Sequence, residues 1–284
     1  MTSVMEPRVI GSKLGFTEGP VWTRDGRLVV TSISHGRLYE LRADGARVVA
    51  ETGGGPNGLT EGEGGFLYVA QNGGVFGMGE RAPAQAVPGI QRVVGGEATY
   101  IAEGLDAPND LCFGPDGRLY FTDPRGPATG ENTRPGRLYA MEMEGAPQLL
   151  AEGPAFINGL AFGPDPRELY VAETFRQRVL LYQLRRGAVS EPQEFCRTEP
   201  GLPDGLCFDE QGRLYVAATL AHEVQVFDGE GRRVGSYPCG DGSMPTNCCF
   251  GGPQGRTLFV TDSAGGRVLA FDLDVPGLPL YPFR

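Results

Sequence analysis

The segment 109–123, NDLCFGPDGRLYFTD, is the pattern from which the fold can be predicted. It starts with a polar residue, runs into a short apolar stretch, breaks at Asp116 and Gly117, and ends in a second run rich in β-forming residues. An Asp-Gly pair between two such runs is a strong signal for a β-hairpin. The segment is therefore expected to form two antiparallel strands joined by a tight turn.

Five further segments repeat this pattern, with starts 39 to 52 residues apart: EGPVWTRDGRLVVTS from Glu18, NGLTEGEGGFLYVAQ from Asn57, NGLAFGPDPRELYVAE from Asn158, DGLCFDEQGRLYVAA from Asp204 and NCCFGGPQGRTLFVTD from Asn247. A third β-like stretch follows each hairpin (GVFGMG at 74–79 in the second unit), and a fourth leads into the next unit. Four short strands per repeat are typical of a propeller blade. We predict an all-β, six-bladed β-propeller of four-stranded antiparallel blades, forming a single domain over residues 1–284.

The two ends of the sequence complement each other. The last unit has no fourth strand after RVLAFDL, whereas the N-terminal stretch PRVIGSKLGFTEG resembles a fourth strand that runs into the first repeat. We therefore expect the N-terminal strand to complete blade six. Such closure leaves no unpaired strand edges in the ring.

The composition of the sequence restricts the kinds of partner that the protein is expected to bind. The 284 residues carry a formal net charge of −10, so nucleic acid and anionic membranes are poor partners. The sequence has no run of 18 apolar residues and no signal-peptide pattern at its start, so we expect a cytoplasmic protein. The six cysteines show no zinc-binding spacing and are expected to be reduced and mostly buried.

The polar residue that starts each repeat is the strongest indication of function. The first strand of every propeller blade lines the central channel, so the six starting residues form a ring at one mouth: Glu18, Asn57, Asn109, Asn158, Asp204 and Asn247. Asn and Asp at these places could simply cap turns. A glutamate is a poor turn residue, however, and six side-chain oxygens converging on one axis favour a bound cation.

The donor set predicts which cation this would be. The ring offers only oxygen atoms, which favour Ca²⁺ over Mg²⁺ or Mn²⁺ and make Zn²⁺ the least suitable of the four ions. Glu18 and Asp204 would neutralise a divalent ion.

A second tier of residues is expected at the same mouth, where the second strands end: Ser32, Gln71, Asp123, Glu173, Ala218 and Asp262. The three acids among them either orient ligands and water or form hydrogen bonds at the rim. A glycine- and proline-rich insertion follows at 124–136, and loops in such places often act as lids. Its Arg125 and Arg134 either contact substrate or stay solvated.

The sequence gives little support to other kinds of catalytic site. The sequence has two histidines, His35 and His222, and no GxSxG motif for a serine nucleophile. His222 either assists as an acid or base or is incidental to the site.

Several motifs together resemble the regucalcin/gluconolactonase family: EGPVW at 18–22, PND at 108–110, FTDPRG at 121–126, FINGLAF at 156–162 and LPDGLCFDEQGRLYVA at 202–217. The resemblance runs from about residue 8 to 274. It implies a six-bladed propeller with a divalent ion, commonly Ca²⁺, in the channel, and in many members hydrolysis of sugar lactones.

The resemblance also implies roles for individual residues. The metal ligands of the family fall on Glu18, Asn158 and Asp204. Asn109 matches a residue that is a ligand or a substrate contact, and Asp110 matches a neighbouring functional position.

Two positions depart from the family's patterns. Ala107 stands where animal regucalcins have a substrate-contacting arginine. Cys248 follows Asn247 where related fluorophosphatases have a histidine of a second metal site.

Taken together, the sequence predicts a metal-dependent hydrolase, a monomer or weak oligomer, that opens a sugar lactone or similar small lactone. Asp204 is the expected general base, and the expected substrate contacts are Asn109, Asp110, Asn57 and Arg125. Two alternatives are a related esterase or phosphotriesterase on the same metal, and a non-catalytic calcium-binding propeller. Fold alone does not choose among them.

Overall fold

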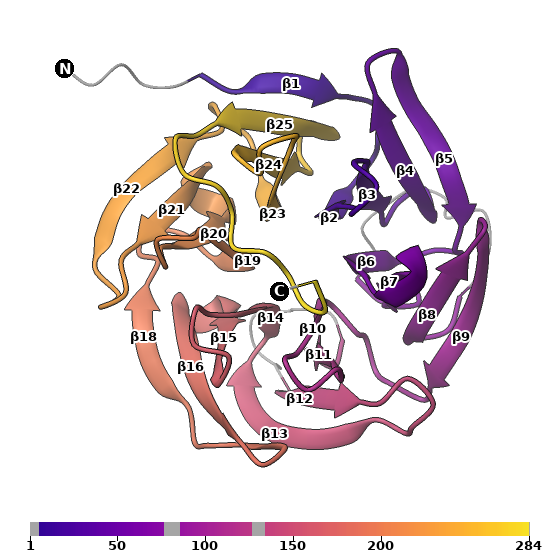
Figure 1. Cartoon of the computed structure of the whole chain (residues 1–284), viewed down its shortest axis with the longest axis vertical. Helices are drawn as coiled ribbons and strands as arrows, with labels where there is room; N and C mark the ends of the chain where they lie inside the picture. The colour runs from indigo at the N-terminus through magenta and orange to yellow at the C-terminus, as the bar shows by residue number, and fades with distance from the viewer. Residues whose placement is uncertain (1–5, 77–85, 127–133, 284) are drawn as a thin grey trace.

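The computed structural model describes residues 6–76, 86–126 and 134–283. Its strands form six antiparallel sheets arranged in a closed ring around a central channel (Figure 1). The predicted six-bladed propeller with four-stranded blades is therefore confirmed.

The blades follow one another along the chain, and each begins with its innermost strand. Blade one contains β2 Thr17–Trp22, β3 Leu28–Ser32, β4 Arg37–Arg42 and β5 Gly45–Glu51; blade two contains β6 Pro56–Glu61, β7 Leu67–Gln71, β8 Gly89–Val94 and β9 Glu97–Glu103; blade three contains β10 Leu111–Phe113, β11 Leu119–Asp123, β12 Pro135–Met141 and β13 Gln148–Ala155. Blade four contains β14 Ile157–Phe162, β15 Glu168–Glu173, β16 Arg178–Arg185, β17 Ala188–Val189 and β18 Gln193–Arg197; blade five contains β19 Pro203–Phe208, β20 Leu214–Ala218, β21 Glu223–Phe227 and β22 Arg233–Pro238. Blade six contains β23 Pro245–Gly251, β24 Thr257–Asp262, β25 Arg267–Asp272 and β1 Arg8–Gly11. Three short 3-10 turns lie in blades two, four and five: η1 Glu63–Gly65, η2 Thr174–Arg176 and η3 Thr219–Ala221.

The N-terminal strand closes the ring, as predicted. β1 pairs antiparallel with β25, with Arg8 opposite Ala270. The Arg8 guanidinium also donates to both carboxylate oxygens of Asp272 at 2.9 Å. Strands from the two ends of the chain thus complete one sheet.

One predicted strand is wrong. The third strand of blade two is Gly89–Val94, not GVFGMG at 74–79. Residues 73–76 belong to a turn, and 77–79 lie outside the described residues. Two glycines with positive φ, Gly73 and Gly74, favour this turn. GIQRVV, by contrast, supplies the side chains that cover the neighbouring strand.

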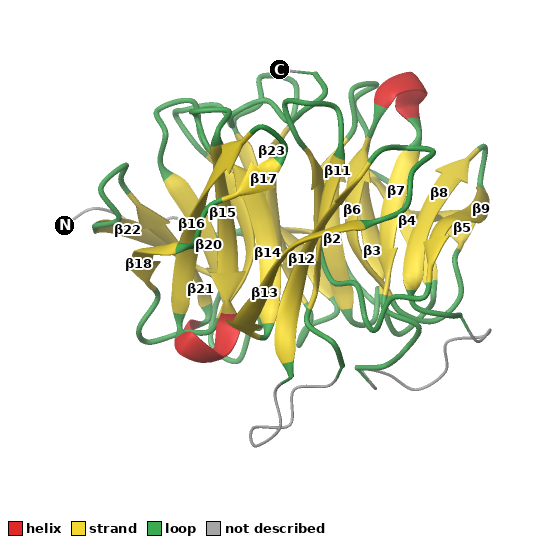
Figure 2. Ribbon diagram, turned by 90° about the horizontal axis from the view of Figure 1, so that it is seen from below, coloured by secondary structure: helices red, strands yellow, loops and turns green. Residues whose placement is uncertain are grey.

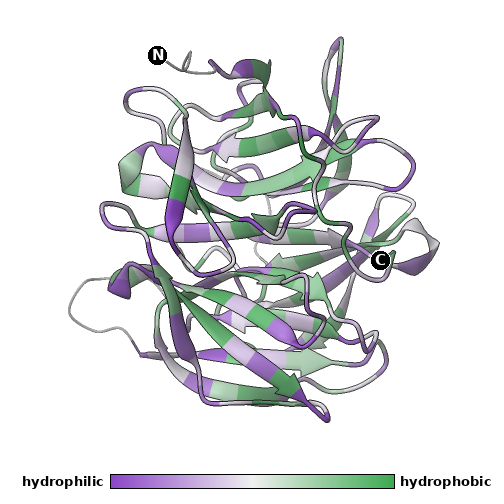
Figure 3. Ribbon diagram, turned by 60° about the vertical axis from the view of Figure 1, so that its left-hand side comes forward, coloured by the Kyte–Doolittle hydropathy of each residue, from purple (hydrophilic) through white to green (hydrophobic). Residues whose placement is uncertain are grey.

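The hydrophobic core lies between neighbouring blades. Second strands such as β3, β7 and β11 are buried along their whole length because a blade packs on each face. At one such interface Tyr120 meets Phe162 edge to face, with ring centroids 5.1 Å apart. Figure 3 shows the hydrophobic stretches along the strands of the blades. Five cysteines are buried and Cys112 is half-buried, as expected.

The C-terminal segment covers one mouth of the channel. After β25 the chain crosses the face of the ring (Figure 1), and Figure 2 shows the C-terminus on that face. The Leu278 amide donates to the Phe208 carbonyl at 2.8 Å, and Tyr281 packs edge to face on Phe162. Phe208 and Phe162 end their innermost strands, so the residues that start those strands lie at the opposite mouth.

The three helical turns are far too short to cross a bilayer, and the described part of the chain holds no helix of the length and apolarity that such a span needs.

Candidate active site

The six predicted ring residues lie at the open mouth of the channel. Each lies within the first two residues of the innermost strand of its blade, or just before it, except Asn247, which is the third residue of β23. Five are buried and Asp204 is half-buried. The structure therefore brings together side chains that are up to 229 residues apart in the sequence.

Glycines let neighbouring blades approach each other closely at this ring. A Cβ atom on Gly159 would lie 2.2 Å from the Asp204 carbonyl oxygen, and one on Gly205 would lie 1.9 Å from Asn247 Oδ1. Real Cβ atoms do not tolerate such distances, so the residue after these ring positions must be glycine. This requirement explains the repeated Asn-Gly and Asp-Gly pairs at the start of the blades.

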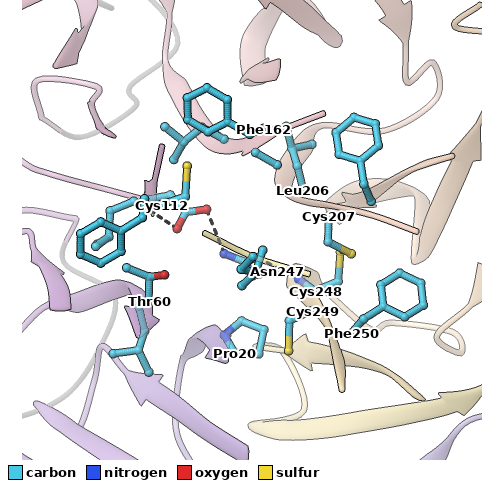
Figure 4. A pocket seen from close by; sticks show the side chains of 18 of the residues that line it. Pro20, Thr60, Cys112, Phe162, Leu206, Cys207, Asn247, Cys248, Cys249 and Phe250 are labelled. Carbon is cyan, nitrogen blue, oxygen red and sulfur yellow. Dashed lines mark hydrogen bonds between the residues drawn. The ribbon is translucent and has the colours of Figure 1, made fainter. Parts of the chain in front are cut away.

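Asp110 occupies the position that glycine has in blades one, two, four and five. Its Oδ1 accepts from the Leu111 amide at 2.9 Å. Its Oδ2 accepts from the Asn247 side-chain amide of blade six at 3.3 Å, and Figure 4 shows this contact across the channel. Asn247 is held in turn by the Cys248 amide, which donates to Asn247 Oδ1 at 2.8 Å.

Three acids at the mouth carry strongly perturbed pKa values. Burial first, and then the charge of Asp110, raise the pKa of Glu18 to about 8, against hydrogen bonds that lower it. Burial raises the pKa of Asp110 to about 6, opposed by hydrogen bonds from Leu111 and Asn247. The pKa of Asp204 lies well above its usual range because of burial first and then the charges of Glu18 and Asp110.

None of these three acids forms an ion pair with a basic residue in the described part of the chain. They repel one another in a region of low dielectric, where a positive charge would be strongly stabilising. Clusters of this kind are common at functional sites, and a bound cation would remove the repulsion.

Asn158 supplies an oxygen that fits such a cation. Its Nδ2 donates to Thr174 Oγ1 at 3.2 Å, and the Thr174 hydroxyl donates to the Pro203 carbonyl at 2.8 Å. These bonds orient the amide, yet Asn158 Oδ1 is buried and has no hydrogen-bond partner, and the same holds for Asn57 Oδ1. Buried oxygens without partners are rare and call for a ligand, an ion or water.

In the described residues no three His, Cys, Asp or Glu side chains lie close enough to hold an ion by themselves. A metal centre at this mouth therefore needs the asparagine oxygens as well as the carboxylates. The donor set as a whole fits a hard, oxygen-ligated divalent ion.

Comparison with known proteins identifies the family. The model of the SMP-30/Gluconolactonase/LRE-like region matches residues 16–274. The chain belongs to the SMP-30/Gluconolactonase/LRE-like family. The resemblance inferred from the blade motifs is thereby confirmed.

Individual relatives are distant but cover most of the chain. A gluconolactonase of Zymomonas mobilis is 27% identical over 90% of this chain and 78% of its own length. A pentonolactonase of Haloferax volcanii is 28% identical over 91% of this chain and 85% of its own length. Among solved structures, a gluconolactonase of Xanthomonas campestris is 27% identical, with a TM-score of 0.77 over 94% of this chain and 89% of its own.

In this member of the SMP-30/Gluconolactonase/LRE-like family, the second-tier acids form hydrogen bonds at the rim. Asp123 accepts from the amides of Asp106 and Ala107, both at 2.9 Å. Glu173 accepts from the Ala155 amide at 2.7 Å, and Asp262 accepts from the Met244 amide at 2.8 Å. Each acid thus fixes the chain that enters its own blade, which is the second of the two predicted alternatives.

Arg125 is held by acids of blade three. Its Nε donates to Asp106 Oδ2 at 3.0 Å, and its Nη1 lies 3.5 Å from Glu152 Oε1. Arg134 donates to the Arg125 carbonyl at 2.7 Å. Contact of Arg125 with substrate stays a prediction, and most of the insertion, residues 127–133, lies outside the described residues.

Both histidines have local partners. His35 Nδ1 lies 3.0 Å from the Tyr39 hydroxyl, and His222 Nδ1 is hydrogen-bonded to the Ser243 carbonyl. These contacts engage one nitrogen of each ring at the rim.

Two features of the site were missed by sequence reasoning. Thr174 orients Asn158, but a threonine in a turn gives no sequence signal for that role. Below the Asp110–Asn247 hydrogen bond, the channel forms a largely apolar cavity of about 90 Å³. The cavity is lined by Cys112, Cys207 and Cys248 and is closed by residues of the C-terminal segment. Cys207 Sγ and Cys248 Sγ lie 3.4 Å apart.

Proposed function

We propose that this protein is a metal-dependent lactonase that hydrolyses a sugar lactone or a similar small lactone. The observation that carries the proposal is a group of three acids without basic partners, buried Glu18 and Asp110 and half-buried Asp204, beside the unpartnered side-chain oxygen of Asn158. Related gluconolactonases and a pentonolactonase support the reaction class. The proposal also assigns the individual metal ligands, and this assignment rests on the positions that match the family's motifs.

Glu18, Asn158 and Asp204 would hold the ion, with Asn109 as a further ligand or a substrate contact. Ca²⁺ suits this oxygen-only donor set best. A divalent ion held by these residues would supply Lewis acidity toward the ester carbonyl and the negative charge that develops on its oxygen.

Asp204 is the residue best suited to accept a proton. It is half-buried while Glu18 and Asp110 are buried, so water at the mouth can reach its carboxylate. Asp204 takes the proton of the attacking water as the new C–O bond forms and the carbonyl π electrons move to oxygen, and it gives that proton to the ring oxygen as the ester C–O bond breaks. Asn109 and Asn57 donate hydrogen bonds to substrate oxygens, and Asp110, held by Asn247, lies below them as a further substrate contact.

The test begins with protein stripped by a chelator and reloaded with Ca²⁺, Mg²⁺, Mn²⁺ or Zn²⁺. Hydrolysis of sugar and aliphatic lactones is then measured beside that of phosphotriesters. We expect lactone hydrolysis, restored best by Ca²⁺. Turnover of phosphotriesters alone would favour the esterase alternative, and calcium binding without any turnover would favour the non-catalytic propeller.

Asp204→Asn removes one charge and the base with almost no change in shape. We expect a loss of at least about 100-fold in kcat, the usual size of a general-base contribution. Asp44→Asn is the matched control because Asp44 is exposed in the turn between β4 and β5. Full activity of Asp204→Asn in saturating Ca²⁺ would show that the assigned role is wrong.

A further inference from the structure

Three phenylalanine rings meet at the open mouth. Phe76 lies in the connection after β7, Phe156 lies between β13 and β14, and Phe175 lies in η2. The ring centroids of Phe76 and Phe156 are 5.8 Å apart, and those of Phe156 and Phe175 are 5.0 Å apart. Segments from blade two, from the junction of blades three and four, and from blade four thus form one aromatic cluster.

The cluster is linked through Thr174 to the candidate metal ligand of blade four. The Thr174 amide donates to the Phe156 carbonyl at 3.1 Å, and the Thr174 hydroxyl accepts from Asn158 Nδ2. Phe175 follows Thr174, and Phe156 precedes Asn158 by two residues. The rings therefore flank the residues that orient the Asn158 oxygen.

The backbone at Phe156 is unusual. Phe156 has φ 56°, a left-handed conformation that aromatic residues rarely adopt. Blade five makes the equivalent bond, from the Thr219 amide to the Leu202 carbonyl at 3.0 Å, and Leu202 does not have positive φ. The left-handed conformation at Phe156 is thus not repeated at Leu202, which follows Gly201, with φ 133°, and precedes Pro203.

The exposure of Phe175 is a second feature of the cluster. The Phe175 side chain is 37% exposed, although burial would be favourable for so large an apolar group. Leu220 has the equivalent place in η3 of blade five and is 64% exposed. The turn therefore does not require an aromatic residue.

We propose that Phe76, Phe156 and Phe175 form a subsite for the hydrocarbon substituent of a lactone whose ester group binds at the neighbouring centre. This inference rests on the proposed function. Phenylalanine side chains offer no hydrogen bond, so they attract alkyl or aryl groups and leave hydroxyl groups unpaired. The subsite favours alkyl-substituted lactones over equally sized polyhydroxylated ones.

The test uses γ-lactones with no substituent and with alkyl substituents of one to six carbons. In the Ca²⁺-loaded wild-type protein, kcat/KM is expected to rise with chain length, by at most about fourfold for each buried methylene. Phe175→Ala should lower the ratio of kcat/KM between the longest and shortest lactones by at least about tenfold. Phe175→Leu, which keeps most of the apolar surface, should recover part of that ratio.

Leu220→Ala is the matched control, because it removes an exposed apolar side chain from the same place in the next blade. Its ratio should equal that of the wild type. Phe156→Gly keeps the left-handed backbone and removes the ring, so it provides a second variant with the same expected loss.

Binding of the corresponding alkyl γ-lactams, which resist hydrolysis, separates this inference from the proposed activity. If lactam affinity rises with chain length in the wild type but not in Phe175→Ala, the subsite stands even when no lactone is hydrolysed. If lactones are hydrolysed but neither kcat/KM nor lactam affinity depends on chain length, the subsite is refuted and the lactonase proposal stands. Equal ratios in Phe175→Ala and Leu220→Ala would also refute it.

Discussion

Asn247 Nδ2 donates a hydrogen bond to Asp110 Oδ2 at 3.3 Å, although the two residues are 137 positions apart. Blade three and blade six lie opposite each other in a ring of six, so this bond spans the channel. It fixes the depth at which the polar mouth ends and the apolar cavity begins. The charge of Asp110 raises the pKa values of Glu18 and Asp204, so the three acids at this mouth repel one another.

Metal-free protein should lose stability as the pH rises from about 4.5 to 8. The pKa of Glu18 is raised from 4.5 to about 8 and that of Asp110 from 3.8 to about 6. Their folded forms bind more protons than the unfolded chain across that window, so the stability present below the unfolded pKa is lost as the pH approaches the folded value. Thermal unfolding in a chelator, followed from pH 4.5 to 8.5, should show a loss of a few kcal/mol.

Calcium bound at the proposed site should offset this loss of stability at high pH. A cation that binds the ionised carboxylates should raise the Tm more at pH 8 than at pH 5. The Glu18→Gln variant, which lacks the largest of these titrations, should give a flatter pH profile without metal. A metal-free profile that is already flat in the wild type would contradict the assignment.

Thr174→Val should weaken Ca²⁺ binding by about tenfold, a typical effect of losing a residue that orients a ligand. The substitution removes the hydroxyl that holds Asn158 Nδ2, and the amide can then rotate. Thr219→Val is the matched control, since Thr219 starts the equivalent turn in blade five and its hydroxyl donates to the Leu202 carbonyl, at 3.4 Å. Calorimetric titration of the stripped proteins measures both affinities, and equal values would exclude the role of Thr174.

Gly205→Ala should destabilise the protein by about 2 kcal/mol or more. The added Cβ would lie 1.9 Å from Asn247 Oδ1 and 2.7 Å from Asn247 Cα, so the backbone of blade six would have to move. Gly235→Ala is the control, because nothing lies within 4 Å of a Cβ atom there. Urea unfolding should separate the two variants clearly, and similar midpoints would mean that the blades can yield at the ring.

Removal of residues 276–284 should open the second mouth of the channel. Leu278 and Tyr281 are half-buried over the cavity, so their loss should cost about 2 kcal/mol and admit water or dye. Removal of 282–284 alone keeps both side chains and should have a small effect. Thermal unfolding and binding of a hydrophobic fluorophore provide the measurements, and an unchanged Tm in the longer deletion would show that the segment seals nothing of energetic importance.

Much of the fold follows from local patterns. The Asp-Gly hairpin at Asp116 and the repeats of the same motif predict the number of blades, because each blade is built from strands that are adjacent in the sequence. Closure by Arg8–Gly11 was predictable as well, since the last repeat lacks a strand and the N-terminus supplies one. The third strand of blade two was misplaced because the glycine-rich stretch at 74–79 has apolar residues but the backbone freedom of a turn.

The site was predictable only in part. The repeat identifies the residue type that starts each blade, and hence Glu18, Asn158 and Asp204 as members of one ring. It does not show that Asp123 and its counterparts are used at the rim, because a carboxylate at a strand end has the same sequence pattern whether it accepts from backbone amides or contacts a ligand.

The sequence by itself determined the blade count, the closure of the ring and the ring of oxygen-bearing residues, because these depend on strand period and repeat spacing. Only the tertiary structure decided that Asn247 bonds Asp110, that Thr174 holds Asn158 Nδ2 while Asn158 Oδ1 stays unpaired, and that Phe76 reaches Phe156. The first and the last are contacts between different blades, and the second joins a turn of blade four to the start of its innermost strand. Their partners depend on how the blades pack around the axis, and short-range sequence patterns carry no information about that packing.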